Sequence, residues 1–387
     1  MKRDIEPFLL EAAGQFPVIA LTGPRQSGKS TTLQHLFKDH YYFTFDDPVI
    51  RRQAKDDPGL FIEQVPAFSI LDEIQYVPEV LPYIKIRVDQ NRDIAGQFLL
   101  TGSQIFQFMA GMTESLAGRV ALFELLPFSL GELGIKHKMP LPDLFTHLYR
   151  GFYPDPAAKG VNADVFFPSY MQTYLERDIR QISNIQDLSL FQKFVELLAG
   201  RVASVLNLSD VARDCGISHT TALKWLSLLG TSRIIYLLRP YFTNINKRLI
   251  KSPKLYFTDP GLLAFLLKYP DSTTLLSGPA AGPFFESLII IEFLKKKFNT
   301  FGRFELYFYR DSNKNEIDLV IDRAEKVDLV EIKMRKNLNY DDVKVLKKIA
   351  IDGKTNDRWI ISCLEHKITI ERTALNVPWW EAAQTLK

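Results

Sequence analysis

Cysteine is scarce in this sequence: only Cys215 and Cys363 occur among 387 residues, and they stand far apart, outside any CxxC pair. A disulfide framework and a zinc site are therefore not expected, and a reducing cytoplasm is the expected environment. Long apolar runs are also lacking, because the most apolar window, residues 284–294, is interrupted by Glu286 and Glu292. The N-terminal stretch is charged rather than apolar. The sequence thus predicts neither a membrane span nor a signal peptide.

A large excess of charge of one sign is absent too: Lys and Arg number 48 and Asp and Glu 45, a formal net charge of +3. Coating of nucleic acid by the whole surface is therefore not expected, although a local basic groove is compatible with this balance. With 46% hydrophobic, 12% aromatic and 24% charged residues, the chain has the composition of a folded globular protein. At roughly 150 residues per domain, its length predicts two to three domains.

Short apolar runs alternate with helix-like segments in the first third of the chain. Runs that are apolar throughout, rather than at every second residue, are typical of strands in a parallel sheet covered on both faces. We therefore predict an α/β domain with a parallel sheet, whose strands lie at residues 17–21, 41–45, 67–71, 97–100 and 119–125.

Residues 23–30 match the phosphate-binding pattern G-x-x-x-x-G-K-[ST] at every fixed position. A predicted strand precedes the motif and a predicted helix follows it, which is the structural context that the motif requires. Backbone N–H groups of such a loop bind phosphates, Lys29 would reach the β- and γ-phosphates of ATP, and Ser30 would ligate Mg²⁺. The residues expected to hold the nucleotide are Gly23, Pro24, Arg25, Gln26, Ser27, Gly28, Lys29, Ser30 and Thr31.

Two further strands end in polar residues that suit the same site. The apolar run 68–71 is followed by two carboxylates. Asp72 is predicted to hold Mg²⁺ through water, and Glu73 to polarise the attacking water. The next strand ends at Thr101 and Ser103. Either hydroxyl could sense the γ-phosphate, and both could equally be plain turn residues.

The segments LTGPRQSGKST, FSILDEIQ, FLLTGSQ and ESLAGRV together resemble an AAA-type P-loop ATPase domain over residues 15 to about 130. With GFYP at 151–154 and YLERDI at 174–179, nearly the whole chain resembles a prokaryotic ATPase family that carries a C-terminal domain of unknown function. The resemblance implies that an arginine near a subunit boundary completes the site of a neighbouring subunit, and Arg119 stands at that position. A local salt bridge of Arg119 is the alternative.

Residues 208–226 predict a helix, a turn at Gly216 and a second helix, with Ser209 and Ser218 as N-caps. A strand of a winged variant follows at 233–242. The outward face of the second helix carries one lysine and no arginine, so DNA contact and a plain packing role are both left open. The predicted apolar face is Val211, Ala212, Ile217, Ala222, Leu223 and Leu226, and the outward face is His219, Thr220, Thr221 and Lys224.

Three carboxylates and a lysine are predicted to converge nearer the C-terminus. Strand alternation places Glu331 and Lys333 on one face of a predicted strand, with Asp318 in the preceding strand of a hairpin and Glu286 in the preceding helix. Carboxylate oxygens suit Mg²⁺ or Mn²⁺, which would stabilise the charge on a phosphodiester under attack, and Lys333 would orient or activate water. The alternative is a hairpin with a solvated charged face.

The D-x12-E-x-K spacing from Asp318 to Lys333, within an α-β-β-β-α-β order, resembles the PD-(D/E)xK restriction-endonuclease-like superfamily over about residues 283–365. Ile317 stands where the superfamily pattern has proline. The resemblance implies a metal-dependent nuclease, and a nuclease-like domain that binds DNA or a partner without cutting is left open. The tail after Val377 is expected to be a short appendage.

The sequence therefore predicts a cytoplasmic α/β protein with an AAA-type ATPase domain at 1–135, a helical connector at 136–182, a winged helix-turn-helix domain at 183–270 and a nuclease-like domain at 271–387. Its expected function is Mg²⁺-dependent ATP hydrolysis coupled to DNA binding or to DNA cleavage with Mg²⁺ or Mn²⁺. One alternative is a nucleotide-dependent signalling or assembly switch that binds DNA or protein without cutting. Another is a DNA-binding regulator with a vestigial ATPase. A homo-oligomer is compatible with each of these functions.

Overall fold

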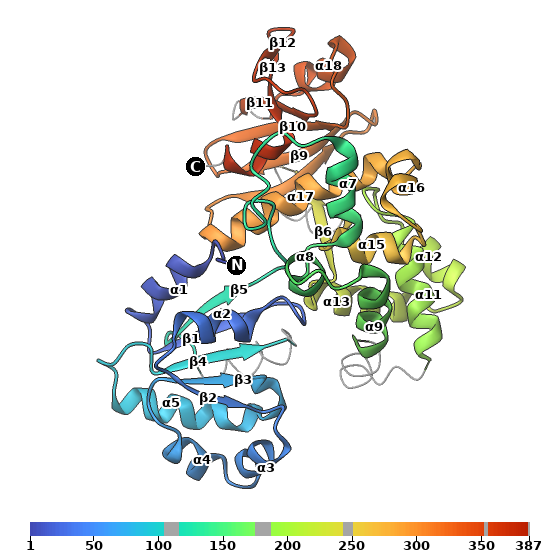
Figure 1. Ribbon diagram of the computed structural model, residues 1–387. Coiled ribbons are helices and arrows are strands. Elements are labelled where there is room, and N and C mark those ends of the chain that lie inside the picture. Colours follow the sequence, from blue (N-terminus) through green and yellow to red (C-terminus); the bar gives the residue numbers. More distant parts are fainter. Residues whose placement is uncertain (104–115, 175–186, 243–250, 352–354, 386–387) are drawn as a thin grey trace. The chain divides into compact units, whose positions relative to one another are not determined.

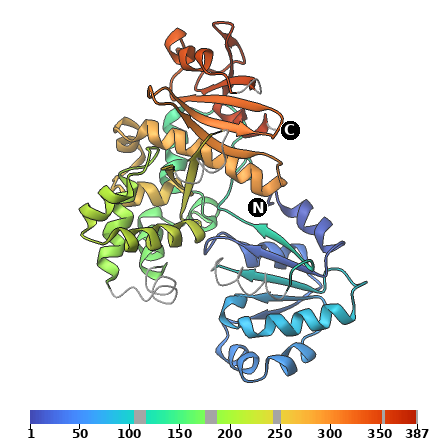
Figure 2. The same cartoon turned by 180° about the vertical axis from the view of Figure 1, so that it is seen from behind.

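The computed structural model describes residues 1–103, 116–174, 187–242, 251–351 and 355–385, and it divides into two compact units (Figure 1 and Figure 2). Unit 1 contains Met1–Phe128 and the short segments Thr231–Arg233 and Phe298–Thr300. Unit 2 contains the remainder, Ser129–Gly230, Ile234–Lys297 and Phe301–Lys387. Gln104 and the residues that follow it to Ser115, and YLERDI from Leu175 on, lie outside the described residues.

Unit 1 is built around a five-stranded sheet in which every strand pairing is parallel, in the order β2-β3-β4-β1-β5. The five strands lie within two residues of the predicted bounds, so the parallel α/β prediction is confirmed. The elements are α1 (Glu6–Ala13), β1 (Val18–Thr22), α2 (Lys29–Leu36), β2 (Tyr41–Thr44), α3 (Pro48–Asp56), α4 (Pro58–Gln64), β3 (Ser69–Asp72), η1 (Ile74–Tyr76), η2 (Pro78–Val80), α5 (Leu81–Gln90), β4 (Phe98–Gly102) and β5 (Val120–Glu124).

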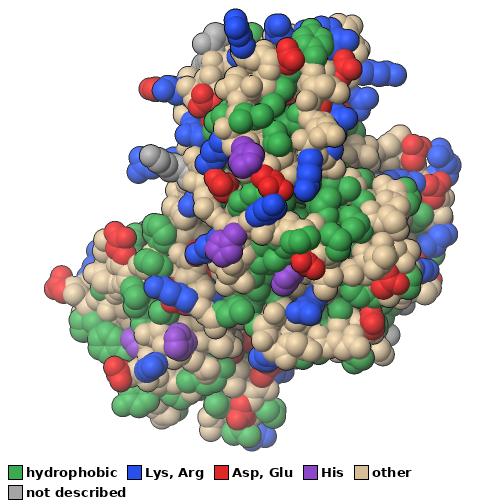
Figure 3. Space-filling view, turned by 45° about the horizontal axis from the view of Figure 1, so that its top comes forward, with side chains coloured by type: hydrophobic (Ala, Val, Ile, Leu, Met, Phe, Trp, Pro, Cys, Tyr) green, Lys and Arg blue, Asp and Glu red, His purple; other side chains and the backbone are tan. Residues whose placement is uncertain are grey.

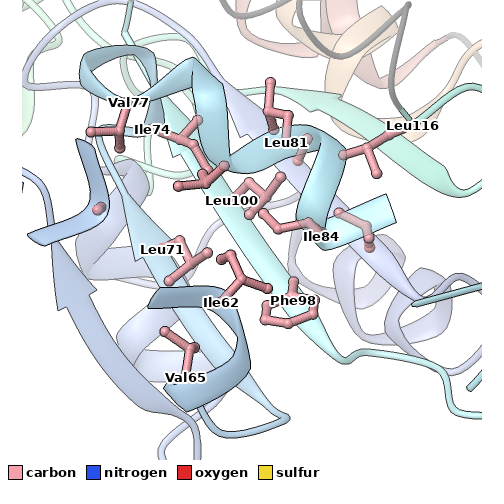
Figure 4. Packing of buried hydrophobic residues seen from close by; sticks show 14 of the residues in the cluster. Ile62, Val65, Leu71, Ile74, Val77, Leu81, Ile84, Phe98, Leu100 and Leu116 are labelled. Atoms are coloured by element: carbon pink, nitrogen blue, oxygen red, sulfur yellow. The ribbon is translucent and has the colours of Figure 1, made fainter. Parts of the chain in front are cut away.

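The sheet of unit 1 buries apolar side chains on both of its faces. In β1, Val18 and Ala20 belong to one core, and Ile19 and Leu21 belong to the other, which α1 and α2 complete. Burial on both faces explains why the central strands β1, β3 and β4, which are buried at every position, are mostly apolar. Figure 4 shows the first core, where helices pack onto β3 and β4 through side chains that include Ile62, Leu81, Ile84, Leu71 and Leu100.

The first half of unit 2 is mainly helical. It contains the GFYP segment, which has a packing role: Gly151, at φ 79°, lies so close to Gly261 that a Cβ atom at Gly261 would collide with the backbone of Gly151, and a Cβ atom at Gly151 would collide with Phe167. The N–H of Phe152 donates to the buried carboxylate of Asp259 over 2.7 Å. The helices here are α7 (Leu141–Arg150), α8 (Pro154–Ala158), α9 (Ala163–Tyr174), α11 (Leu188–Ala199), α12 (Leu208–Cys215), α13 (His219–Thr231), α15 (Pro260–Leu266) and α16 (Ser272–Ser277).

Helices α12 and α13 are joined at Gly216, whose φ of 81° lies in the left-handed region. Ser218 accepts a 3.0 Å hydrogen bond from the N–H of Thr221, as expected of an N-cap. Ser209 is not a cap, contrary to the prediction, because α12 begins earlier in the chain and Asn207 is its N-cap.

Leu223 was predicted in the apolar face of α13, but it is 49% exposed. The buried stripe of this helix runs through Ala222, Trp225, Leu226 and Leu229, at spacings of three and four residues, and Leu223 lies beside that stripe. His219, Thr220 and Lys224 are exposed, so the outward face of α13 carries both polar and apolar side chains.

The second half of unit 2 contains an eight-stranded mixed sheet in the order β12-β13-β11-β10-β9-β8-β6-β7. The hairpin that follows α13 joins this sheet, because β6 pairs in parallel with β8. The predicted domains 183–270 and 271–387 therefore share one sheet and one compact unit. The elements are β6 (Ile235–Pro240), β7 (Lys254–Phe257), α17 (Ala281–Thr300), β8 (Glu305–Arg310), β9 (Glu316–Asp322), β10 (Val327–Lys333), α18 (Tyr340–Lys348), β11 (Thr355–Ser362), β12 (Thr369–Ile370), β13 (Ala374–Pro378) and η4 (Trp379–Gln384).

The described residues after Val377 are part of the core rather than an appendage. Strand β13 pairs in parallel with β11, with Val377 opposite Ile361, and Trp379 is only 2% exposed. The expectation of a short appendage after Val377 is wrong, because this apolar stretch supplies side chains that the sheet buries.

Candidate functional site

The phosphate-binding loop follows β1 and requires glycine at two positions. Gly23 has φ 143°, and a Cβ atom there would collide with the carbonyl oxygen of Leu125. Gly28 has φ 95° and is the N-cap of α2. Both backbone conformations are rarely adopted by residues with a side chain. The loop therefore approaches β5 closely and then turns sharply into the N-terminus of a helix, where phosphate binding is favoured.

The side chains that follow Gly28 point to the carboxyl ends of the strands. Lys29 is buried, and its Nζ donates to the carbonyl oxygens of Gly23 and Pro24 over 3.1 and 2.9 Å. Ser30 Oγ donates to Asp72 Oδ1 over 2.7 Å. The predicted pair of Mg²⁺ ligands thus meets, although its members come from two separate segments of the chain, and Lys29 stands next to Ser30 with its ammonium group on the carbonyl oxygens of the loop.

Asp72 lies at the end of β3 and accepts hydrogen bonds from hydroxyl groups on three sides. Besides Ser30, they belong to Thr101 at the end of β4 and to Tyr42 of β2, whose OH lies 2.6 Å from Asp72 Oδ2. Burial raises the pKa of the Tyr42 hydroxyl, and the hydrogen bond to Asp72 raises it further. Tyr42 was not predicted, because nothing in its own segment resembles a site motif.

Glu73 is held by a polar network beside Asp72. Its backbone has φ 58°, in the left-handed region, and its N–H donates to Thr101 Oγ1 over 3.2 Å. Ser103 Oγ donates to Glu73 Oε2 over 3.1 Å, and Gln75 Nε2 donates to the same oxygen and to Ser103 Oγ. Gln75 is buried, and among the described residues its Oε1 has no hydrogen-bond partner. Sequence reasoning missed Gln75, although it stands in the DEIQ segment.

The remaining loop residues differ in their environments. Arg25 Nη2 donates to Tyr76 OH over 3.0 Å, and Gln26 has φ 58°. Ser27 is fully buried, and its Oγ has no hydrogen-bond partner within the described part of the chain. Thr31 is exposed on α2. Their predicted contacts with a nucleotide stay predictions.

Arg3 contacts the backbone of the phosphate-binding loop at Ser27. The sequence did not predict this role. Arg3 is 3% exposed. Its guanidinium donates to the carbonyl oxygens of Ser27 over 2.9 Å and Leu126 over 2.6 Å, and it lies over the ring of Phe128. A buried arginine that satisfies two carbonyl groups ties the loop to the segment after β5.

Arg119 lies just before β5, at the edge of the sheet opposite to the phosphate-binding loop. Its carbonyl oxygen accepts from the N–H of Val18 at the start of β1. Its guanidinium forms a bidentate pair with Asp89 of α5, over 2.7 and 2.9 Å, and these hydrogen bonds lower the pKa of Asp89. Within this chain Arg119 thus has the local partner that was the alternative to a finger role. Its role in a neighbouring subunit stays a prediction.

The predicted carboxylate–lysine residues of unit 2 come together on three elements. Glu286 lies on α17, Asp318 on β9, and Glu331 and Lys333 on β10. Lys333 Nζ is 2.5 Å from Glu331 Oε2 and 3.5 Å from Asp318 Oδ2. The hairpin of β9 and β10 therefore presents both carboxylates to one lysine, as strand alternation predicts.

Lys254 of β7 belongs to the same cluster and was not predicted. Its side chain is 2% exposed, and its Nζ lies 3.1 Å from Glu286, 2.6 Å from Glu316 and 3.7 Å from Asp318. Tyr256 of the same strand donates its OH to Glu286 Oε1 over 2.6 Å. No sequence pattern links β7 to the D-x12-E-x-K spacing, because the two segments are brought together only by the sheet.

Burial and mutual repulsion shape the protonation of this cluster. Desolvation raises the pKa of Glu286 and of Glu331, and the nearby charge of Asp318 raises both further. Burial opposes the ammonium form of Lys254, but Glu286, Asp318 and Glu316 outweigh it and raise the pKa of this lysine. The carboxylates are thus close enough to compete for positive charge.

The carboxylate oxygens of this cluster suit a hard divalent cation, but the side chains are not arranged around a common metal position. Glu331 is 5% exposed, and its Oε1 has no hydrogen-bond partner in the part of the chain that the structure describes. Carboxylate oxygens are the preferred ligands of Mg²⁺ and Mn²⁺. Among the described residues, however, no group of three or more His, Cys, Asp or Glu side chains is arranged to hold a metal ion. Glu286, Asp318 and Glu331 stay predicted ligands.

Unit 1 is a P-loop domain of the AAA type: it has a parallel sheet, a phosphate-binding loop after β1 and carboxylates at the end of β3. Residues 15–134 match a family model described as an AAA domain. Residues 141–273 and 281–381 match two models described as domains of unknown function, DUF8612 and DUF4143. In the described part of the chain, no helix has both the length and the apolar character to cross a membrane.

Two mycobacterial proteins are similar to this chain over almost its whole length. The uncharacterized protein Mb2031c of Mycobacterium bovis and the uncharacterized protein Rv2008c of Mycobacterium tuberculosis are each 28% identical over 381 residues. The alignments cover 97% of this chain and 83% of each relative.

Among solved structures, the Walker-type ATPase PABY2304 of Pyrococcus abyssi has a TM-score of 0.44 and 14% identity, covering 68% of this chain and 94% of that one. AMPPCP-bound DnaA from Aquifex aeolicus has a TM-score of 0.30 and 14% identity, covering 58% of this chain and 84% of that one.

Proposed function

We propose that unit 1 binds ATP with Mg²⁺ and hydrolyses it. The observation that supports this proposal is the hydrogen bond between Ser30 and Asp72, with Lys29 next to Ser30 in the loop after β1 and Glu73 next to Asp72 at the end of β3. Lys29 would leave its two carbonyl acceptors for the phosphates. Ser30 and Asp72 would hold Mg²⁺, which neutralises charge on the phosphates when bound. Glu73 would position the attacking water.

The direct test is phosphate release by the purified full chain with ATP, with Mg²⁺ or with excess chelator. We expect turnover that requires Mg²⁺ and that Asp72→Asn abolishes, because the amide weakens metal binding while it keeps its size. Asp46→Asn is the matched control, since Asp46 is also in unit 1 but does not contact Ser30. Equal turnover of the Asp72 variant and the wild type would contradict the assignment.

A second candidate function concerns the carboxylate–lysine cluster of unit 2, for which we propose metal-dependent action on DNA phosphodiesters. Four carboxylates, those of Glu286, Glu316, Asp318 and Glu331, face two lysines, with Arg310 reaching Glu316 from the rim. Among the described residues, Glu331 Oε1 has no hydrogen-bond partner, so it is available to a metal ion. A bound Mg²⁺ or Mn²⁺ would act there as a Lewis acid.

DNA binding without cleavage is the alternative for unit 2. Lys224 and His219 on the exposed face of α13 could contact phosphates, but this face lacks the basic stripe typical of tight DNA binders. On the molecular face drawn in Figure 3, basic and acidic side chains are interspersed, with no extended field of one sign. On the face that Figure 3 shows, this distribution favours a local contact over broad electrostatic binding.

Incubation of the full chain with plasmid DNA separates these functions for unit 2. Reactions contain Mg²⁺ or Mn²⁺, with and without ATP, and binding is followed in parallel by gel shift. Cleavage that Asp318→Asn abolishes and Asp322→Asn preserves would support the metal-dependent site, because both carboxylates lie on β9 but Asp322 is outside the cluster. A gel shift with intact plasmid under every condition would favour the non-cutting alternative, and ATP dependence of that shift would favour a switch.

A further inference from the structure

We propose that Lys254 is a built-in counter-ion that occupies the cation position of the unit 2 carboxylate cluster, so that a divalent metal ion enters only by displacing it. This inference rests on the second function proposed above. It starts from the position of Lys254 Nζ, which lies within 4 Å of three carboxylates: Glu286, Glu316 and Asp318. A metal ion would be drawn to the same place by the same oxygens.

The backbone holds Lys254 firmly in this position. Lys254 pairs with Leu238 of β6 on one side and forms an isolated bridge with Val205 on the other. Its Nζ lies 5.7 Å from the centre of the Phe308 ring. Because both neighbours fix the strand, the ammonium group can leave the carboxylates only through rotation of its own side chain. The lysine is therefore a component of the site rather than a passing surface contact.

Asp318 lies between two lysines, which are not equivalent. Lys333 approaches from β10, within the predicted D-x12-E-x-K motif, and binds Glu331 as well. Lys254 approaches from β7, outside that motif, and binds Glu286 and Glu316. Removing the charge of Lys254 would take from three carboxylates the cation that they share, while Lys333 would still pair with Glu331 and Asp318, and Arg310 with Glu316. The affinity of the emptied position for a divalent ion should then rise.

Lys295 offers a matched control in the same unit. It is 1% exposed, and its Nζ lies 3.1 Å from Glu292 Oε1, the same distance as that between Lys254 and Glu286. Lys295→Met therefore removes a buried lysine charge beside Glu292, with the buried carboxylate of Asp259 also within its electrostatic reach, at a place separate from the Asp318 cluster. It should lower stability as Lys254→Met does, without creating a metal site.

The test is calorimetric titration of the nucleotide-free full chain with MnCl₂, together with melting temperatures with and without MnCl₂. We expect Lys254→Met to bind Mn²⁺ at least about tenfold more tightly than the wild type and to gain a larger Mn²⁺-dependent rise in Tm. The Lys295→Met variant should behave like the wild type. Adding Asp318→Asn to Lys254→Met should remove the gain, which separates this site from any metal bound by unit 1.

Two results would overturn the inference: one rejects only the role of Lys254, and the other also rejects the proposed metal site. If the wild type binds Mn²⁺ through Asp318 but Lys254→Met binds it equally or more weakly, Lys254 is not a competing cation, and the metal site stands. If Asp318→Asn changes Mn²⁺ binding in neither background, the metal site itself is wrong. Should Lys254→Met fail to fold, Lys254→Gln, which can still donate a hydrogen bond to Glu286, replaces it in the same titrations.

Discussion

Ser30 and Asp72 are separated by 42 residues in the chain, yet the serine hydroxyl donates a 2.7 Å hydrogen bond to the aspartate carboxylate. The contact exists because β1 and β3 run in the same direction in the sheet, so that both residues lie at its carboxyl edge. Ligands bind at this edge in open α/β sheets. The fold therefore brings the two side chains that are expected to share a metal ion into direct contact.

Substitution of Lys29 tests the phosphate contact. Lys29→Ala should weaken ATP binding strongly, because each charge-assisted contact is worth about 1.5–3 kcal/mol. Affinity for a fluorescent ATP analogue, measured by equilibrium titration, checks this. Lys38→Ala is the control, since Lys38 is an exposed lysine of the same unit. Unchanged affinity of the Lys29 variant would remove the nucleotide assignment of the loop.

Glu73→Gln separates binding from chemistry. The variant keeps the size of the side chain but loses the carboxylate that would position water. We expect normal ATP affinity and a turnover lower by about 10²–10⁴-fold if Glu73 acts as the base. Affinity and phosphate release are measured on the same preparation. Wild-type turnover would reassign Glu73 to a structural role.

Gln75 should act as a positioning residue for Glu73. Gln75→Met removes the amide that donates to Glu73 and to Ser103 while it keeps a similar length. Loss of a hydrogen bond to a charged group costs about 1.5–3 kcal/mol, so kcat should fall by roughly 10- to 100-fold with KM little changed. A parallel loss of kcat and ATP affinity would instead indicate general disruption of the site.

Arg3→Met tests whether the N-terminal segment supports the phosphate-binding loop. The substitution leaves the carbonyl oxygens of Ser27 and Leu126 buried without their donor, at a cost of about 1–3 kcal/mol each. We expect a lower Tm and weaker ATP binding, with Arg3→Lys intermediate because lysine can reach one acceptor but not form the fork. A lower Tm with unchanged ATP affinity would limit Arg3 to stability alone.

Mixing of variants tests the finger role of Arg119. If Arg119 completes the site of a neighbouring subunit, inactive Lys29→Ala chains and inactive Arg119→Ala chains should regain ATPase activity when mixed, because each supplies what the other lacks. If Arg119 only pairs with Asp89, mixing should restore nothing. Asp89→Asn should then reproduce the defect of Arg119→Ala.

The sequence by itself determined the features that depend on neighbouring residues. Apolar strands at regular intervals predicted the parallel sheet, and the glycine and lysine pattern at residues 23–30 predicted the loop between β1 and α2. Asp72 and Glu73 were identifiable because they end an apolar strand, and Glu331 and Lys333 because strand alternation alone puts them on one face. Such patterns depend only on local backbone geometry, which can be inferred from neighbouring residues without knowing the rest of the fold.

Only the tertiary structure decided which distant segments complete the two sites. Tyr42 reaches Asp72 because β2 lies beside β3, and Lys254 reaches Asp318 because β6 and β7 continue the sheet of β8, β9 and β10. The burial of Trp379 likewise depends on β13 pairing with β11. Strand order is set by the packing of all elements together. The sequence around a lysine or tyrosine in a strand therefore does not reveal which distant carboxylate that residue will contact.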